Sequence, residues 1–271
     1  MAYEQKSQTK PSPSATFHAS AAHRIASRPH LCIGLVLALG AISQASAGVA
    51  FVQGGSKDAY SALGGQVVVT LTWSSAQQAG DLNVISIGVV AGNTITSVMD
   101  SAGNSYLQAI SAGALGGSEV LYYAANIKAA AAGANTATVT FNGGTGNNVK
   151  ANVGSQLVGG VSIAEYSGIA TTNALDVAAG SDGTAPLTGG TASSGQASTT
   201  NANDLLIGGY WAGSTAGTAG TGYTMRTGGI EDQTVTTVGS YSATAQVSKP
   251  GGWWVMLVAA FRAVSSGSVC D

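Results

Sequence analysis

The sequence predicts an all-β protein, a two-sheet antiparallel β-sandwich of the jelly-roll type with about eleven strands. Three observations support this prediction. Short segments alternate apolar and polar residues, Gly- and Asn-rich turn signals separate them roughly every ten residues, and no segment shows the helical period. The composition agrees, since 45% of the residues are hydrophobic and 8% are charged, against about 25% charged in typical globular domains.

The first 47 residues are predicted to be a secretory signal peptide. The apolar run Leu31–Ile42 is too short to span a bilayer, Arg24 and Arg28 precede it, and Ala45-Ser46-Ala47 follows as a cleavage site. Cleavage after Ala47 would leave a sandwich domain at 48–264 and a flexible tail at 265–271, secreted or held at the cell surface. A soluble amphipathic leader is the alternative, and the long region before the apolar run leaves open a downstream translation start.

The strands of the predicted sandwich divide into two kinds. Those apolar on both faces belong in sheet centres, and those with one Ser/Thr face belong where that face meets water. The predicted strands are 67–73, 82–90, 95–99 with 105–107, 120–127, 136–141, 161–167, 204–207, 223–226, 234–238, 240–247 and 253–264, with a further short one at 174–178. The doubly apolar ones are 82–90, 161–167 and 253–264.

A hairpin is predicted where residues 95–99 and 105–107 flank the sequence Asp100-Ser101-Ala102-Gly103-Asn104. Asp at the start of a turn accepts backbone N–H groups, and Gly supplies a positive φ. The oxygens of Asp100 and Asn104 also make a weak calcium candidate, but a calcium loop needs several carboxylates. The plain turn is therefore favoured, and no other metal site is predicted.

The segment 180–201 is mostly Gly, Ser and Thr, which predicts a long surface loop or a linker. On its two sides the chain contains a faint echo. Residues 79–82 (AGDL) resemble 202–205 (ANDL), and 164–168 (AEYSG) can be laid on 259–263 (AAFRA). Two related halves would explain this, and so would chance in a Gly- and Ala-rich chain.

Several of these segments together resemble those of a known group of proteins. The run ITSVMDSAGNSY, followed by LYYAANI, NTATVTF, AEYSG and a closing WVMLVAAFRAV, resembles uncharacterised secreted bacterial β-sandwich proteins. These are similar in shape to concanavalin-like lectin and glucanase jelly rolls. The likeness spans Gln66 to Val264 and consists of turns and core strands, so it implies fold and export and carries no catalytic residue.

Much of enzyme chemistry is excluded from the mature chain. All three histidines (His18, His23, His30) lie in the leader, which removes Ser-His-Asp and Cys-His catalysis and His-based zinc sites. No two carboxylates alternate on one strand as in a jelly-roll glucanase, and the adjacent Glu231 and Asp232 would point to opposite faces. A non-enzymatic protein without a cofactor is predicted.

Charge and cysteine content limit the partners further. Residues 48–271 carry six basic and eleven acidic side chains, a formal charge of −5, which gives no basic footprint for nucleic acid. Their one cysteine, Cys270, is next to the last residue, where it could pair between chains or remain an inert tail thiol.

The aromatic residues suggest a binding surface. They come as adjacent pairs at 122–123, 210–211 and 253–254, and neighbours on a strand face opposite ways. Trp253 is predicted to face the core, while Tyr123, Trp211 and Trp254 would face outward as a platform for sugar rings. The alternative is that loops cover that face and all six rings are core.

One carboxylate stands out in a core strand. Glu165 lies within the apolar strand 161–167, where burial would raise its pKa and make it a candidate acid or ligand-binding group. The alternative is a structural Glu that is hydrogen-bonded to a neighbouring strand.

The sequence thus predicts an exported module that binds carbohydrate or another surface through outward aromatics, polysaccharide or cell-surface glycan being the expected partner. The alternative is a structural or adhesive protein that self-associates through poorly charged strand edges. The Thr-x-Thr spacing at 70–72 and 136–140 would also suit a flat hydroxyl array that binds ice or a crystalline polymer, although threonine is simply a good strand former.

Overall fold

The computed structural model describes residues 48–61, 65–114, 116–143, 156–213, 217–247 and 251–264. All of them belong to one compact unit, Gln44–Asp271. The predicted signal peptide and the tail with Cys270 lie outside the described residues. Within these residues, no helix is long and apolar enough to cross a membrane.

The described residues confirm the all-β class, but they form seventeen strands instead of eleven. Several of the additional strands are only two to four residues long, too short for an alternating pattern to reveal them. The strands are β1 Ala50–Ser61, β2 Gly65–Thr72, β3 Leu82–Val90, β4 Thr94–Asp100, β5 Leu107–Ala114, β6 Gly117–Ala124, β7 Thr136–Gly143, β8 Gln156–Ser167, β9 Leu175–Thr184, β10 Gly190–Ser193, β11 Ala197–Ser198, β12 Leu205–Ala212, β13 Thr224–Thr227, β14 Ile230–Thr234, β15 Ser240–Tyr241, β16 Thr244–Val247 and β17 Trp253–Phe261.

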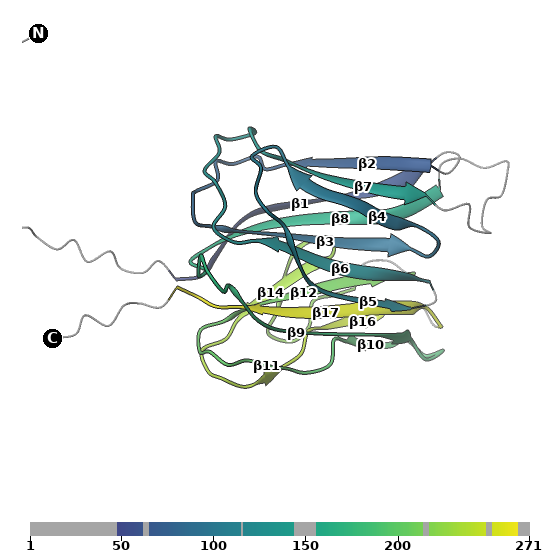
Figure 1. The fold of residues 1–271 in the computed structure, drawn as a ribbon. Coiled ribbons are helices and arrows are strands. Elements are labelled where there is room, and N and C mark those ends of the chain that lie inside the picture. The colour runs from purple at the N-terminus through teal and green to yellow at the C-terminus, as the bar shows by residue number, and fades with distance from the viewer. Residues whose placement is uncertain are drawn as a thin grey trace, which may run out of the picture. The chain divides into compact units, whose positions relative to one another are not determined.

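These strands are stacked in four layers, where two sheets were predicted (Figure 1). A three-stranded sheet, β2-β7-β4, covers one face of a five-stranded sheet, β1-β8-β3-β6-β5. A second five-stranded sheet, β13-β14-β12-β17-β9, packs on the other face of the first. The pairs β10-β16 and β11-β15 then cover the far face of this second sheet. Both large sheets are therefore buried on both sides.

Three hydrophobic cores fill the spaces between the layers. The middle core joins the two five-stranded sheets, with Leu82 and Tyr166 on one side and Leu205 and Phe261 on the other. The two outer cores lie beneath β2-β7-β4 and beneath the two small sheets. Strands β3, β8 and β17 need apolar residues on both faces because each lies between two cores, as their sequences predicted.

The prediction of a hairpin around Asp100 is wrong. Strand β4 pairs with β7 in the three-stranded sheet, whereas β5 pairs with β6 in the first five-stranded sheet. Asp100 accepts hydrogen bonds from the backbone N and the Nδ2 of Asn104, at 2.9 and 2.8 Å. The turn is present as predicted, but it passes the chain from one layer to the next.

The segment 180–201 also differs from the loop or linker that its composition suggests. It contains the second half of β9 and all of β10 and β11. Small residues suit these strands because Ala192 and Ala197 are buried in the outer core of the second half. Composition alone does not separate a Gly/Ser/Thr loop from a strand of small residues that lies under another layer.

The strand order repeats between the two halves of the chain. The first large sheet has the order β1-β8-β3-β6-β5, and the second, read from its other end, has β9-β17-β12-β14-β13. Matching these strands in sequence order pairs β1 with β9, β3 with β12, β5 with β13, β6 with β14 and β8 with β17. Ala219 forms a β-bridge to Ala245 of β16. The segment at Ala219 therefore lies beside β16 as β4 lies beside β7 in the first half.

The register of the strands repeats as well. Leu82 lies opposite Tyr166 in the first half, and Leu205 lies opposite Phe261 in the second. The residue before each leucine is an aspartate whose carbonyl accepts the same kind of backbone hydrogen bond, from Ile127 N at 3.1 Å and from Val235 N at 2.9 Å. These matches support two related halves over chance as the source of the sequence echo.

Candidate functional site

The structure does not bring the predicted aromatic residues together on one surface. The ring of Tyr123 packs edge-on against Phe261, with 5.2 Å between centroids, at the middle core. Trp254 packs against the outer core on the opposite face of β17, while Trp253 packs against the middle core. Because both faces of each large sheet are covered, the pairs at 122–123 and 253–254 each send their two rings into two different cores.

Glu165 is fully buried and is held by the neighbouring strand β1. Its Oε2 accepts a 2.5 Å hydrogen bond from Nε2 of Gln53, which lies opposite it in the sheet. This contact is the one that a structural role requires. Asp81 lies near it, and burial together with the charge of Glu165 raises the pKa of Asp81 to about 6.

The calcium candidate has its oxygens engaged within the protein. Besides the Asn104 contacts, Oδ2 of Asp100 accepts hydrogen bonds from the Tyr106 hydroxyl at 3.0 Å and from Nδ2 of Asn135 at 3.1 Å. In the described residues, no three His, Cys, Asp or Glu side chains are grouped so that they could hold a metal ion.

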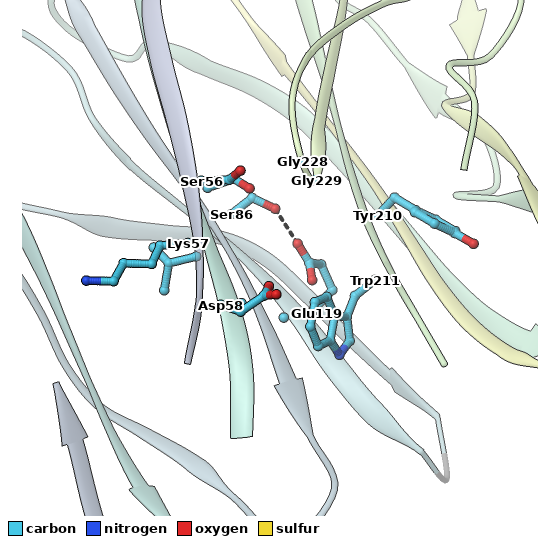
Figure 2. Close-up of a pocket in the computed structure, with 13 residues that line it drawn as sticks. Ser56, Lys57, Asp58, Ser86, Glu119, Tyr210, Trp211, Gly228 and Gly229 are labelled. Atoms are coloured by element: carbon cyan, nitrogen blue, oxygen red, sulfur yellow. Dashed lines mark hydrogen bonds between the residues drawn. The ribbon is translucent and has the colours of Figure 1, made fainter. Parts of the chain in front are cut away.

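A cavity of about 70 Å³ lies where β1, β8, β3 and β6 of the first large sheet face the second half of the chain (Figure 2). Its walls come from five strands and from the Gly228–Gly229 turn between β13 and β14. Figure 2 shows Ser86, Asp58 and Glu119 around this space, with the indole of Trp211 beside them.

Two rows of residues that cross the first sheet form the floor of this cavity. In one row, Ser56, Ser162 and Ser86 lie directly opposite one another on β1, β8 and β3. Two residues along each strand, the second row runs from Asp58 through glycines 160 and 88 to Glu119 on β6. Because positions two apart share a face, the three hydroxyls and the two carboxyl groups project to the same side.

Trp211 from the second half lies on the two glycines of this floor. A Cβ atom at Gly88 would lie 2.1 Å from Cδ2 of the indole, and one at Gly160 would lie 2.9 Å from Cζ3. Only glycine admits a ring this close to the backbone. The indole therefore takes the space between Asp58 and Glu119, and it forms one wall of the cavity.

Glu119 is the most unusual group in the cavity. It is 1% exposed, the Ser86 hydroxyl donates to its Oε1, and its Oε2 has no hydrogen-bond partner. Burial raises the pKa of Glu119 to about 8, and the Ser86 hydrogen bond lowers it only in part. At neutral pH the carboxyl group of Glu119 is therefore protonated, and it can both donate and accept a hydrogen bond toward the cavity.

The mouth of the cavity lies at the edge strand β1. Ser56 and Asp58 are exposed there, whereas Ser86, Ser162 and Glu119 are buried at the floor. The Gly228–Gly229 turn passes close over the serine row, where a Cβ at position 228 would be 2.9 Å from the Ser56 hydroxyl. Figure 2 shows Lys57 extending away from the carboxyl group of Glu119 and the Tyr210 hydroxyl turned to the opposite side.

The sequence pattern pointed to Trp211 but not to Glu119 or the serine row. The sequence did contain a signal for Glu119. On a strand, Glu119 lies on the same face as the apolar Leu121 and Tyr123, whereas Ser118 lies on the opposite face. A carboxylate on the apolar face of a strand is a candidate for a buried site. No local pattern could show that the serines of three strands would come into register, because pairing decides this.

Comparisons with known proteins give no further information on the site, since no family model, no curated protein and no solved structure matches the chain.

Proposed function

We propose that the protein is an exported β-sandwich module that binds a glycan, with the Glu119 cavity as its contact site. The observation that carries this proposal is the buried Oε2 of Glu119, which faces a cavity and has no partner in the protein. Burying a polar atom without a hydrogen bond is costly, so such an atom is explained best by a ligand group that completes it.

The other walls fit a sugar derivative. Hydroxyls both donate and accept, the rigid indole supplies an apolar wall, and sugar-binding sites need both kinds of contact. A space of about 70 Å³ admits one substituent of a sugar ring and no more. The ring itself would therefore lie at the mouth, beside Asp58 and Ser56, and the glycan would be held by one end or one side group.

The finer fold assignment belongs to the same proposal. Each half would be a jelly roll, and the order β1-β8-β3-β6 opposite β2-β7-β4 supports this, because alternating strands of a two-sheet roll come from the two ends of the chain. Jelly rolls recur among lectin domains. This likeness concerns the fold alone, and it favours glycan binding.

The test is glycan binding by the protein and by two matched variants. Glu119→Gln removes the acid at the cavity, and Glu231→Gln removes a second buried carboxyl that lies in another core, away from the cavity. Binding to a panel of oligosaccharides should be lost with Glu119→Gln and kept with Glu231→Gln. Equal binding by both variants, or no binding by the unaltered protein, would overturn the proposal.

A second candidate function, surface adhesion, is favoured by the outward face of β2-β7-β4. Threonines 70 and 72 lie opposite threonines 138 and 136, and Oγ1 of Thr72 and Oγ1 of Thr136 are 2.9 Å apart. The one charged residue of these strands, Asp100, is buried. Val68 and Met99 on the same face are 54% and 53% exposed. An uncharged, hydroxyl-rich sheet face suits contact with another flat surface.

Light scattering separates adhesion from glycan binding. Thr138→Lys places a charge at the centre of this face, and Leu187→Lys places one at an exposed residue on the β9–β10 connection. If the face mediates self-association, oligomers of the unaltered protein should dissociate with Thr138→Lys only. A monomeric unaltered protein that does not adsorb to polymer surfaces would contradict this function.

A further inference from the structure

The strand that matches β6 in the second half also carries a buried carboxylate. This residue is Asp232 on β14. Because Leu205 matches Leu82, Asp232, which lies opposite Ile207, occupies the position of Tyr123, which lies opposite Val84; it is comparable to Glu119 in burial but lies four residues further along the strand. Asp232 also faces the first half, since it lies beside the Tyr166 hydroxyl and helps raise the pKa of that hydroxyl.

The second half supplies a cation for its carboxylate. Nε of Arg226 on β13 is 2.8 Å from Oδ2 of Asp232, and the guanidinium also lies 4.9 Å from the ring centroid of Phe51. In the first half, the residue opposite Glu119 on β5 is Ala112, which has no charge to offer. The buried carboxyl group of β14 therefore has an arginine partner, whereas that of β6 has no cation opposite it.

The turn that covers the serine row differs from the matching turn of the other hairpin. Gly228 and Gly229 lie over the serine row, whereas Gly116, in the turn between β5 and β6, packs against Trp253. A Cβ at Gly116 would lie 2.1 Å from Nε1 of that indole. Serines thus line the space at one turn, and a tryptophan fills the space at the other.

The charges that line the cavity favour a positive occupant. Its titratable lining residues are Asp58, Glu119, Lys57 and Tyr210, and the last two extend away from the Glu119 carboxyl group. Two carboxyl groups and three serine hydroxyls remain. An ammonium group has three N–H donors and no acceptor, so Oε2 of Glu119 and the hydroxyls can satisfy all three.

We propose that the cavity binds a protonated primary amine, the amino group of an amino sugar at the end or side of the glycan. The glycan part of this inference rests on the proposed function. The amine part rests on Glu119, beside which the lining residues place no cation. The ammonium group would pair with Glu119 as the Arg226 guanidinium pairs with Asp232. A cation supplied by the ligand would then complete a buried carboxyl group that has no cation opposite it.

Binding of the amine should be linked to a proton. Burial keeps Glu119 protonated near neutral pH, whereas a bound ammonium group would stabilise the carboxylate. Methylammonium, which stays protonated at these pH values, should therefore displace about one proton per molecule bound at pH 7. Its affinity should rise up to about tenfold per pH unit between pH 6 and 8 and then level off.

The experiment compares four probes by calorimetry on the intact protein. These are a glucosamine oligosaccharide, its N-acetylated form, a cello-oligosaccharide without nitrogen, and methylammonium chloride. We expect the glucosamine oligosaccharide to bind about tenfold or more tightly than the other two glycans, because a charged hydrogen bond is lost in each of them. Methylammonium should bind with proton release, and Glu119→Gln should abolish both effects while Glu231→Gln keeps them.

The outcomes distinguish the amine from the glycan. Equal binding of all three oligosaccharides would overturn the amine and leave the proposed function standing. Methylammonium binding that depends on Glu119, without any glycan binding, would overturn the proposed function and support the amine. If none of the four probes binds, both the amine proposal and the proposed function are overturned. Circular dichroism of each variant identifies any that fails to fold, and Ser162→Ala, which removes one floor hydroxyl, then serves as the second test with an expected several-fold loss.

Discussion

The indole of Trp211 packs so closely on Gly88 that a Cβ atom at this glycine would lie 2.1 Å from Cδ2 of the ring. Trp211 belongs to β12 and Gly88 to β3, the equivalent strands of the two halves. The contact therefore joins the halves at the place where the cavity forms. It depends on the absence of a side chain at Gly88 and at Gly160.

Gly88→Ala is expected to destabilise the protein by about 1–3 kcal/mol, because the new methyl group must displace the indole or the backbone. Chemical denaturation measures this change. Gly55→Ala is the matched control, since Gly55 also lies in a strand of the first sheet and its Cβ would meet only Cδ2 of Leu71 at 3.9 Å. A Gly88→Ala variant as stable as Gly55→Ala would contradict the packing described for Trp211.

Glu119→Gln is expected to change how stability depends on pH. The pKa of Glu119 is about 8 in the folded protein and 4.5 ordinarily, so the folded state holds this proton more tightly than the unfolded state does. The stabilisation by the protonated group is complete below pH 4.5 and is lost as pH rises toward 8, at up to about 1.4 kcal/mol per pH unit. The Gln variant should therefore gain stability relative to the unaltered protein between pH 5 and 8. Parallel curves would show that Glu119 is not held in its neutral form.

Asp81→Asn should act in the same direction at lower pH. Burial, and then the charge of Glu165, raise the pKa of Asp81 from 3.8 to about 6, so its contribution to stability is lost as pH rises through 4 to 6. The Asn variant should be more stable, relative to the unaltered protein, at pH 7 than at pH 4. Urea denaturation at the two pH values checks this, with the exposed Asp182→Asn as a control expected to show little difference. A larger relative stability at pH 4 would contradict the sign.

Arg226→Gln is expected to cost about 1–3 kcal/mol, because the buried Asp232 would lose its charged partner. Arg226→Lys keeps the charge but not the planar contact with Phe51, so it should retain part of the stability. Thermal unfolding of the three proteins gives the order. If the Gln variant is as stable as the unaltered protein, the comparison between Asp232 and Glu119 loses its basis.

Tyr123→Ala is expected to lower stability by about 2–4 kcal/mol, because the ring packs on Phe261 between the two large sheets. Tyr60→Ala, at a 52% exposed tyrosine, should cost under about 0.5 kcal/mol. Both are measured by denaturation, before any binding assay on these variants is interpreted. If the Tyr123→Ala variant is as stable as the unaltered protein, the packing of this ring between the two large sheets is contradicted.

Local pattern was enough to predict the all-β class, the central strands and the turn at Asp100. Alternation reports which faces of a strand are apolar, and β3, β8 and β17 are apolar on both faces because two layers cover each of them. The same pattern could not identify the covering layers. It therefore placed Tyr123 and Trp254 outside, although each packs against a different core.

The sequence by itself determined the all-β class, the central strands, the low charge, the absence of histidine after residue 30 and the echo between two halves. Tertiary structure decided the pairing of β4 with β7 and the burial of both large sheets. It also brought three serines and two carboxyl groups into register under Trp211. The physical reason is that period-two alternation is a local property of the chain, whereas the partner of each strand can be a distant segment, as β1 pairs with β8 across 112 residues at Gln53 and Glu165. The cavity at Glu119 exists only where two such distant segments meet.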